Sequence, residues 1–350
     1  MNISALNITD YLLSKKWENE FESLNTFSTD FGETYNFDIK NIRNTLLKLS
    51  IKDQNFFIKQ PKFFISGTSW PIINEAKFFE LNKHLDFNNI SFFYDDINRV
   101  LVMDCLRRNK NLRSSYKDCV EEAVIHLSKM HEIYSLNGKN RQKINEFVLY
   151  NGLNNLNHYQ TFLNQISFGI HSDLFLDEVV FLKIYKEKSP EFRPLLYNLI
   201  RSKEVLGAFN ELKSLDKTNC LIHGDIKYNN IGFKGEELNF LDFELAGPGD
   251  NSWDLACLIE DTLAILYRKE NNIKKLEILQ SIIKNYSFER DISFIERLFK
   301  FWGLKKLERL RYADFTLQEF RKHIYEIEVL LTKNAICASK YQSNNPDFLM

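Results

Sequence analysis

The hydrophobic pattern of this chain changes its period near residue 110, and this change limits the folds that the chain can adopt. Before that point, short runs rich in aromatic and β-branched residues alternate with turn residues, which is typical of antiparallel strands. These runs span residues 34–39, 45–51, 55–60, 90–97 and 99–106, with one helical pattern at 71–85. After that point, apolar residues recur at helical spacing. The sequence therefore predicts an α+β protein, with a small antiparallel sheet followed by a mostly helical part.

The helical part contains one expected interruption. Helices are expected at residues 115–134, 174–185, 192–212, 253–267, 274–286, 294–304 and 317–333. Two apolar runs, Leu221–Phe233 and Leu238–Gly247, lie between these helices, and a short turn separates them. We expect the two runs to pair as a β-hairpin. We place the boundary between the two parts of the chain after residue 104, which gives domains 1–104 and 105–350.

Composition excludes several classes of protein. The net charge of -1 argues against a dedicated nucleic-acid binder, which would carry a basic excess. No signal peptide begins the chain, and no apolar run approaches the roughly 18 residues that span a membrane, so we expect a cytoplasmic protein without a membrane partner. The five cysteines form no CxxC pair and are expected to be buried, reduced thiols. They are Cys105, Cys119, Cys220, Cys257 and Cys337. The sequence leaves the oligomeric state open.

Polar side chains follow the apolar runs of the expected hairpin. Asp225 and Asn230 lie five positions apart, just beyond the short apolar strand that begins the first run, and Asp242 follows the strand-like LNFL. A hairpin brings its two ends side by side, so we expect these side chains to lie close together. Carboxylate and amide oxygens are hard ligands that suit Mg²⁺. For a phosphoryl-transfer site, Asp225 would be the base that accepts a hydroxyl proton, and Asn230 and Asp242 the metal ligands.

The ordered motifs HGDIKYNN, LDFE and WDLA resemble those of the aminoglycoside phosphotransferase and choline kinase family, relatives of the protein kinases. That family carries HGDxxxxN, then a hydrophobic stretch ending in Asp, then D-L-A at a helix start, and all three match here in order and spacing. The resemblance implies a bilobed protein-kinase-like fold. Residues 1–104 would form the nucleotide-binding lobe, and residues 105–350 the helical lobe with the catalytic hairpin and the substrate site. It also implies ATP and Mg²⁺ as cofactors.

The resemblance further implies a lysine on the third strand, paired with a glutamate on the helix that follows. Lys59 ends the third expected strand, and Glu75 lies in the first turn of the helix at 71–85. This pair would hold the α- and β-phosphates of ATP. Glu80 is the rival partner, but it lies later on the helix. Lys227, two residues after Asp225, is expected either to touch the γ-phosphate or to be solvated.

Other nucleotide contacts are expected from two loops. The chain has no GxGxxG motif, so Arg43 and Asn44, with their backbone N–H groups, would have to cover the phosphates from the turn between the first two strands. The end of the run at 99–106 is expected to link the two lobes. There the backbone groups of Asp104, Cys105 and Leu106 would face adenine, while the strand itself would be an ordinary buried one.

Three further residues near the motifs are expected to have supporting roles. Asp254 precedes an apolar helical run, so its plain role is that of an N-cap, and the resemblance implies that it braces the catalytic loop from behind. His223 is interpreted as a brace of the same loop, because Asp225 already fills the position of the base. Glu244 stands where many kinases have Gly, and two interpretations stay open. It is either an acid near the metal or substrate, or a solvated turn residue.

The remaining candidates have plainer interpretations. The other histidines lack ligand spacing with Cys or Asp, so we interpret them as core or surface residues. They are His84, His126, His131, His158, His171 and His323. The aromatic residues of 294–302 fall at helical spacing and predict core packing. The basic segment 304–312 is expected to be a solvated helix face that could, less plausibly, meet an anionic substrate.

The leading hypothesis is an ATP- and Mg²⁺-dependent kinase that phosphorylates a hydroxyl of a small molecule, such as an aminoglycoside or an amino alcohol. The connection from Asp242 to Asp254 is too short for an activation segment, which favours a constitutively active enzyme acting on a small molecule or a flexible peptide. One alternative is therefore a kinase that phosphorylates Ser or Thr of a natural-product precursor peptide before elimination. Another alternative is a nucleotide-binding pseudokinase.

Overall fold

The computed structural model divides the chain into two compact units. It describes residues 35–36, 44–51, 54–61, 71–85, 87, 90–106, 116–151, 191–266, 272–289, 293–310 and 315–333. The first unit comprises residues 1–111 and 229–246, and the second comprises residues 112–228 and 247–350. The predicted helix at 174–185 lies outside the described residues.

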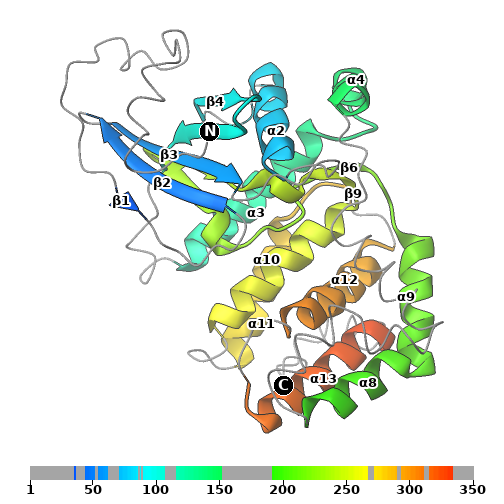
Figure 1. The fold of residues 1–350 in the computed structure, drawn as a ribbon. Helices are drawn as coiled ribbons and strands as arrows, with labels where there is room; N and C mark the ends of the chain where they lie inside the picture. Colours follow the sequence, from blue (N-terminus) through cyan, green and yellow to red (C-terminus); the bar gives the residue numbers. More distant parts are fainter. Residues whose placement is uncertain are drawn as a thin grey trace. The chain divides into compact units, whose positions relative to one another are not determined.

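In its described residues, the first unit contains a five-stranded sheet and the helix α2 (Figure 1). The strands are β1 (Tyr35–Asn36), β2 (Asn44–Ile51), β3 (Gln54–Pro61), β4 (Phe92–Asp95) and β5 (Val100–Asp104), and the helix is α2 (Pro71–Leu85). Their order in the sheet is β1-β2-β3-β5-β4, and every neighbouring pair is antiparallel. Buried residues of β3 and β5, among them Phe56, Ile58 and Val102, anchor the sheet in the core. The predicted small antiparallel sheet with a helix at 71–85 is confirmed.

The predicted single hairpin is replaced by two separate strand pairs. Strand β7 (Ile231–Lys234) pairs with β8 (Glu237–Phe240), while β6 (Cys220–Ile222) pairs with β9 (Gly247–Gly249). The polar residues between β6 and β7 end the first strand, and the 3₁₀ turn η2 (Tyr228–Asn230) lies before the second. Asp225 therefore follows β6 rather than a strand of the β7–β8 hairpin.

The β7–β8 hairpin is part of the first unit, although the predicted boundary after residue 104 placed it with the helices. Gly232 lies so close to Leu106 that an added Cβ would be 2.7 Å from the Leu106 Cβ. Lys234 also forms an ion pair with Asp104, with 2.8 Å between Nζ and Oδ2. These contacts tie the hairpin to the end of β5 and to the residues that follow it.

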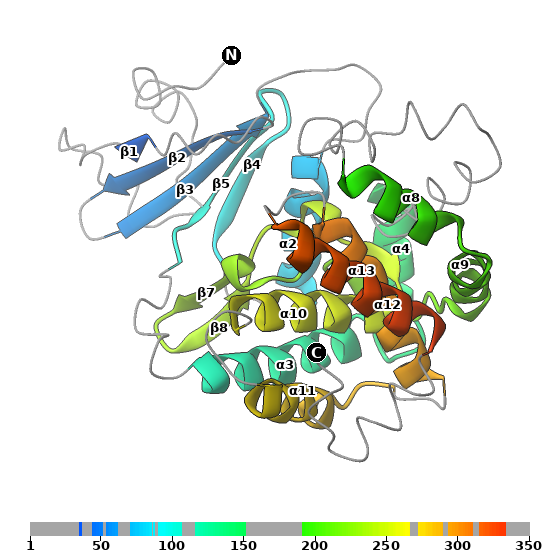
Figure 2. The ribbon, with the colours of Figure 1, turned by 90° about the horizontal axis from the view of Figure 1, so that it is seen from below.

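The second unit is mostly helical (Figure 2). The helices described in this unit are α3 (Tyr116–Ile133), α4 (Arg141–Asn151), α8 (Phe192–Arg201), α9 (Lys203–Leu215), α10 (Asn251–Leu266), α11 (Asn272–Asn285), α12 (Phe294–Arg309) and α13 (Leu317–Thr332). Helix α10 packs against α3, α11 and α12, and α12 also packs against α13. Most of the α10 residues are buried, so α10 is the central helix of this unit.

Two helix predictions need correction, and one helix had no prediction. The helix expected at 192–212 is two helices, because Ser202 has extended backbone (ψ 137°) and caps α9 by accepting the Val205 N–H at 3.1 Å. Helix α12 continues to Arg309, beyond the expected end at residue 304. Helix α4 was not expected from the sequence.

The aromatic residues of α12 are core residues, as their spacing predicted. Phe294, Phe299 and Phe301 are fully buried, and the Phe301 ring meets the Trp253 ring of α10 edge to face at 5.8 Å. Among the described cysteines, Cys119, Cys220 and Cys257 are buried free thiols and Cys105 is partly exposed. The helices in the described part of the chain are all too short or too polar to cross a membrane.

Candidate functional site

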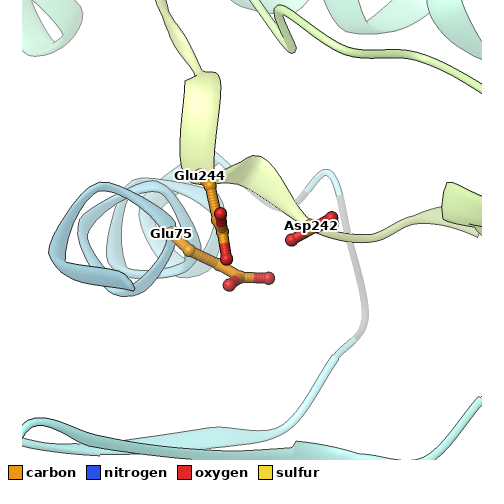
Figure 3. A group of neighbouring side chains, drawn as sticks. All are labelled: Glu75, Asp242 and Glu244. Carbon is orange, nitrogen blue, oxygen red and sulfur yellow. The ribbon is translucent and has the colours of Figure 1, made fainter. Parts of the chain in front are cut away.

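One lysine and three carboxylates meet in the first unit. The Lys59 Nζ lies 2.8 Å from Glu75 Oε2 and 2.7 Å from Asp242 Oδ1, and it also forms an ion pair with Glu244. Figure 3 shows Glu75 on helix α2 and the two other acids on the segment after β8, with the three side chains directed toward a common point. The predicted Lys59–Glu75 pair is therefore present. The rival partner Glu80 is exposed and does not take this place.

Aromatic packing fixes the acids of this cluster against helix α2. Phe243 begins the 3₁₀ turn η3 (Phe243–Leu245), is fully buried, and stacks on Phe78 with ring centroids 4.0 Å apart. It also meets the ring of Phe79 edge to face at 5.8 Å. Because Phe243 lies between Asp242 and Glu244, its insertion holds both acids beside α2.

Asp242 has a left-handed backbone (φ 68°, ψ 52°), which non-glycine residues adopt rarely and at a cost of about 1–3 kcal/mol. Leu241, the preceding residue, donates its N–H to the Asn230 carbonyl at 2.8 Å, so the two predicted metal ligands lie on neighbouring ends of one hairpin. The Asn230 residue is buried, while the Asp242 side chain is 40% exposed. Strained backbone of this kind is concentrated at functional sites.

The charges of the cluster are not balanced. Burial lowers the pKa of Lys59, but the three carboxylates outweigh burial and raise it, so Lys59 carries its positive charge. Burial outweighs the charge of Lys59 at Glu75 and raises the pKa of this carboxyl group to about 7. The cluster holds three carboxyl groups and one ammonium group, a composition that favours the binding of a further cation.

The donor set fits a hard divalent cation. Single oxygens of Glu75, Asp242 and Glu244 all lie within 4.8 Å of one another. Carboxylate oxygens are the ligands that Mg²⁺ prefers in proteins. Glu244 is 15% exposed at its side chain and paired with Lys59, so the interpretation of it as a solvated turn residue is wrong.

A second cluster of charges surrounds Asp225 in the second unit. Lys227 Nζ lies 2.5 Å from one carboxylate oxygen of Asp225, and Lys305 Nζ lies 3.0 Å from the other. Burial raises the pKa of Asp225, but the charges of Lys305 and Lys227 outweigh burial and hold the pKa below its ordinary value. The carboxylate is therefore ionised, as a group that accepts a hydroxyl proton must be.

Asp254 holds the loop that carries Asp225. One Asp254 oxygen accepts the His223 N–H at 2.7 Å, and the other accepts the Gly224 N–H at 2.8 Å. His131 of α3 lies 3.1 Å from the same carboxylate, with its other ring nitrogen 2.7 Å from the Tyr286 hydroxyl. The predicted brace is confirmed. The plain interpretation of Asp254 as the N-cap is wrong, because α10 begins three residues earlier, at Asn251.

The backbone of the same loop depends on glycine and on a tryptophan. Gly224 has φ 86°, a conformation that residues with a Cβ rarely adopt. The Trp253 Nε1–H donates to the Gly224 carbonyl at 2.8 Å, and the Asp225 N–H donates to His223 Nδ1 at 3.3 Å. His223 is fully buried, which agrees with its interpretation as a brace.

Lys305 is the residue that sequence reasoning missed. The basic segment 304–312 was expected to be a solvated helix face, but the Lys305 side chain is only 15% exposed and that of Lys306 only 10%. Lys306 pairs with Glu326 at 2.8 Å. A signal was present in the sequence, because Lys305 follows the aromatic Phe301 by four residues and therefore lies on the same face of the helix.

Hydrogen bonds to other backbone groups occupy two of the three backbone N–H groups that were expected to face adenine. The Asp104 N–H donates to the Ser91 carbonyl at 3.0 Å, and the Cys105 N–H donates to the Asn55 carbonyl at 2.8 Å. Neither N–H can therefore be given to adenine without breaking the ladder. A contact between a backbone N–H and adenine therefore stays a prediction for Leu106, the third of these residues.

Two predicted sets of residues stay predictions. Arg43, expected at the phosphates, lies outside the described residues, and Asn44 is the first residue of β2. Asp225 belongs to the second unit, whereas Asn230 and Asp242 belong to the first. The prediction that Asp225 lies close to Asn230 and Asp242 is therefore untested.

The family match falls on the segment that carries these motifs. Residues 182–273 match the model described as the phosphotransferase enzyme family, abbreviated APH. This segment contains HGDIKYNN, LDFE and WDLA, so the match confirms the resemblance. No curated protein sequence matches the chain.

Solved structures with a similar fold are kinases of small molecules. A choline kinase from Cryptosporidium parvum Iowa II aligns with a TM-score of 0.56 at 12% identity, covering 97% of this chain and 98% of that one. The streptomycin–ATP–APH(2")-IIa ternary complex aligns with a TM-score of 0.52 at 14% identity, covering 100% of both chains. Choline kinase LicA from Streptococcus pneumoniae gives 0.51 at 14% identity, covering 94% of this chain and 99% of that one.

These likenesses establish the predicted α+β, bilobed protein-kinase-like fold. Together with the match of residues 182–273 to the phosphotransferase enzyme family, this fold supports a kinase-like phosphotransferase. Sequence identities of 12–14% are too low to assign the acceptor of any of these enzymes to this protein.

Proposed function

We propose that this protein is an ATP- and Mg²⁺-dependent O-phosphotransferase that transfers the γ-phosphoryl group to a hydroxyl of a small molecule. The observation that carries the proposal is the contact of Lys59 with both Glu75 and Asp242. The three residues come from three separate segments of the chain. A kinase needs this combination to hold the nucleotide phosphates beside its metal ligand.

In this proposal the first unit binds the nucleotide. Lys59, oriented by Glu75, contacts the α- and β-phosphates, and Leu106 meets adenine through its backbone. Asp242 and Asn230 hold Mg²⁺, with Glu244 as a further carboxylate beside it. When bound, the ion neutralises charge on the phosphates. Lys59 would then leave Asp242 to the metal and keep Glu75.

Asp225 would orient the acceptor hydroxyl and accept its proton. The oxygen of the acceptor forms a bond to the γ-phosphorus as the bond to the β-phosphate oxygen breaks, and ADP leaves with that oxygen. Because the carboxylate is ionised, it is ready to take the proton at neutral pH. Lys227 lies beside it and would reach the γ-phosphate, where its charge stabilises the transferred group.

The acceptor we propose is an aminoglycoside-type compound or an amino alcohol. The support is the similarity of fold to structures of choline kinases and of an aminoglycoside phosphotransferase with streptomycin. The short connection between Asp242 and Asp254 also favours an acceptor that needs no docking segment. A precursor peptide as acceptor stays a prediction from the sequence.

The test is ADP formation from ATP and Mg²⁺ with choline, streptomycin and a series of other amino alcohols and aminoglycosides. The wild-type protein should form ADP and a phosphorylated acceptor with at least one of them. Asp225→Asn and Asp242→Ala should each remove most of this turnover. Undiminished turnover in both variants would refute the proposal, and ATP binding without turnover on any acceptor would favour a pseudokinase.

A further inference from the structure

The carboxylate of Asp225 has a lysine at each of its oxygens, and the two lysines come from different elements. Lys227 lies on the same loop, two residues further along, and its side chain is 37% exposed. Lys305 comes from helix α12, 80 residues away in the sequence, and its side chain is 15% exposed. Of these two lysines, Lys305 is therefore the one that joins the Asp225 carboxylate to the helical core of the second unit.

Lys305 is itself held in place. Its Nζ donates to Glu308 Oε2 at 2.9 Å, one helical turn further along α12. The Lys305 Nζ also lies 5.6 Å from the centre of the Trp253 ring, whose own indole N–H bonds the loop at the Gly224 carbonyl. Helix α12 packs on α10 and α13, so the ammonium group stands on a rigid support.

We propose that Lys305 is a positioning residue for Asp225. From helix α12 it binds the Oδ1 atom of Asp225 and so fixes the orientation of the carboxylate, while the Oδ2 atom binds Lys227 of the loop. This inference rests on the proposed function of Asp225 as the base. A carboxylate held at one oxygen by a buried donor has fewer orientations to lose when the acceptor hydroxyl arrives. The motifs that carry the family resemblance do not include this helix.

The charged groups around Asp225 in this unit show how Lys305 affects the pKa of Asp225. The groups facing it from α10 are Asp261 and Cys257, and those from α12 are Lys305 and Glu308. Asp261 and Glu308 are acidic, whereas the charges of Lys305 and Lys227 favour the ionised form of Asp225. Removing Lys305 should therefore raise the pKa of Asp225 by about 1–3 pH units, the usual effect of a neighbouring opposite charge.

The test compares Lys305→Met, Lys305→Arg and a control on the same helix. Lys300→Met is that control, since Lys300 is also buried, with 2% of its side chain exposed, and forms ion pairs with Glu211 and Glu296 instead. The titration of ¹³C-labelled aspartate is followed by NMR in each full-length protein, and the Asp225 signal is identified by its loss in Asp225→Asn. Thermal unfolding is measured in parallel to detect a purely structural effect.

The expected result is an upward shift of the Asp225 titration in Lys305→Met, no shift in Lys300→Met, and recovery in Lys305→Arg. With the acceptor found active for the wild type, or with water as acceptor if none is found, kcat should fall about 10–100-fold in Lys305→Met. The KM for ATP should stay within about twofold, because the nucleotide is bound by other residues.

Two results would overturn the inference. One is a Lys305→Met protein whose Asp225 titration and kcat match those of Lys300→Met. The other is a loss of activity that Lys305→Arg does not restore and that follows the fall in thermal stability, which indicates packing alone. If the wild type forms no ADP under any condition, the proposed function fails, yet the NMR titration still decides whether Lys305 controls the carboxylate.

Discussion

The two charged clusters of this molecule are built on opposite plans. In the first unit, one cation, Lys59, is shared by Glu75, Asp242 and Glu244. In the second unit, one anion, Asp225, is shared by Lys227 and Lys305. The first cluster keeps an excess of negative charge, and the second surrounds a carboxylate with positive charge.

This difference separates a site that recruits a cation from a site that keeps a base ready. Excess carboxylate charge near Lys59 is relieved when a divalent ion arrives, so the cluster gains by binding metal. Positive charge around Asp225 lowers the pKa of the carboxylate, so the group stays ionised and oriented without metal. The two clusters should therefore respond differently to the same kind of mutation, and the following changes test that expectation.

The largest effect should come from Asp225→Asn, which removes the anion of the second cluster. Loss of a general base lowers kcat by about 10²–10⁴-fold. The amide keeps the size of the side chain, and its oxygen can still accept from one lysine, so thermal unfolding should change little. The measurement is initial rate of ADP formation at saturating ATP. A variant that keeps more than about a tenth of the wild-type kcat would contradict the role of Asp225 as the base.

Asp242→Ala should have the next largest effect, and it should act through the metal. Loss of one charged group that stabilises the transferred phosphoryl group lowers kcat by about 10²–10³-fold. The dependence of the rate on Mg²⁺ concentration should shift to higher concentrations, a change not expected in Asp225→Asn. Titration of Mg²⁺ at fixed ATP measures both variants. Identical Mg²⁺ dependence in Asp242→Ala and wild type would remove Asp242 from the metal site.

Asp254→Ala should affect stability first, and only in the second unit. The substitution leaves the buried N–H groups of His223 and Gly224 without their acceptor, at a cost of about 1–3 kcal/mol for each group. Urea unfolding should show a loss of about 3 kcal/mol. Binding of a fluorescent ATP analogue below the unfolding transition should be kept, because the Lys59 cluster does not depend on this brace. Equal loss of nucleotide binding would mean that the two clusters are not independent.

A control for this experiment lies on another helix of the same unit. Thr316→Ala removes the capping box of α13, in which Thr316 and Glu319 accept each other's backbone N–H groups. The loss should be about 1 kcal/mol. If Thr316→Ala costs as much as Asp254→Ala, the two hydrogen bonds to the catalytic loop contribute less than their burial suggests.

The first cluster was easier to foresee than the second, for a physical reason. Strand periodicity and turn residues located β3 and α2 closely, so Lys59 and Glu75 could be paired before any coordinates were known. Asp242 was predicted as a metal ligand because it comes directly after an apolar strand. These signals are local, because each depends on residues within one or two elements of the sequence.

The second cluster depends on contacts that no local pattern contains. Lys305 reaches Asp225 only because α12 packs on α10, and the periodicity of α12 gives the buried face but not the helix that covers it. A lysine is also a residue that pattern reasoning assigns to the surface. The division of the hairpin into two strand pairs was missed for a related reason, since β6 pairs with a strand that lies beyond β7 and β8.

The smallest effect should come from Glu244→Gln, which removes one negative charge from the first cluster and keeps the shape of the side chain. The amide can still accept a hydrogen bond from Lys59, but a bond to a neutral acceptor is about half as strong as one to a carboxylate. We expect a loss of about 1 kcal/mol, or about fivefold, in the affinity for Mg²⁺ with nucleotide.

The measurement is isothermal titration of Mg²⁺ with a non-hydrolysable ATP analogue, so that turnover does not interfere. Glu80→Gln is the matched control, because Glu80 is an exposed acid of α2 outside the cluster. A variant that binds Mg²⁺ as well as the control would place Glu244 in the cluster only as a partner of Lys59. A loss as large as that of Asp242→Ala would instead make Glu244 an equal metal ligand. Two acids of one turn, Asp242 and Glu244, would then bind the metal together, instead of Asp242 alone.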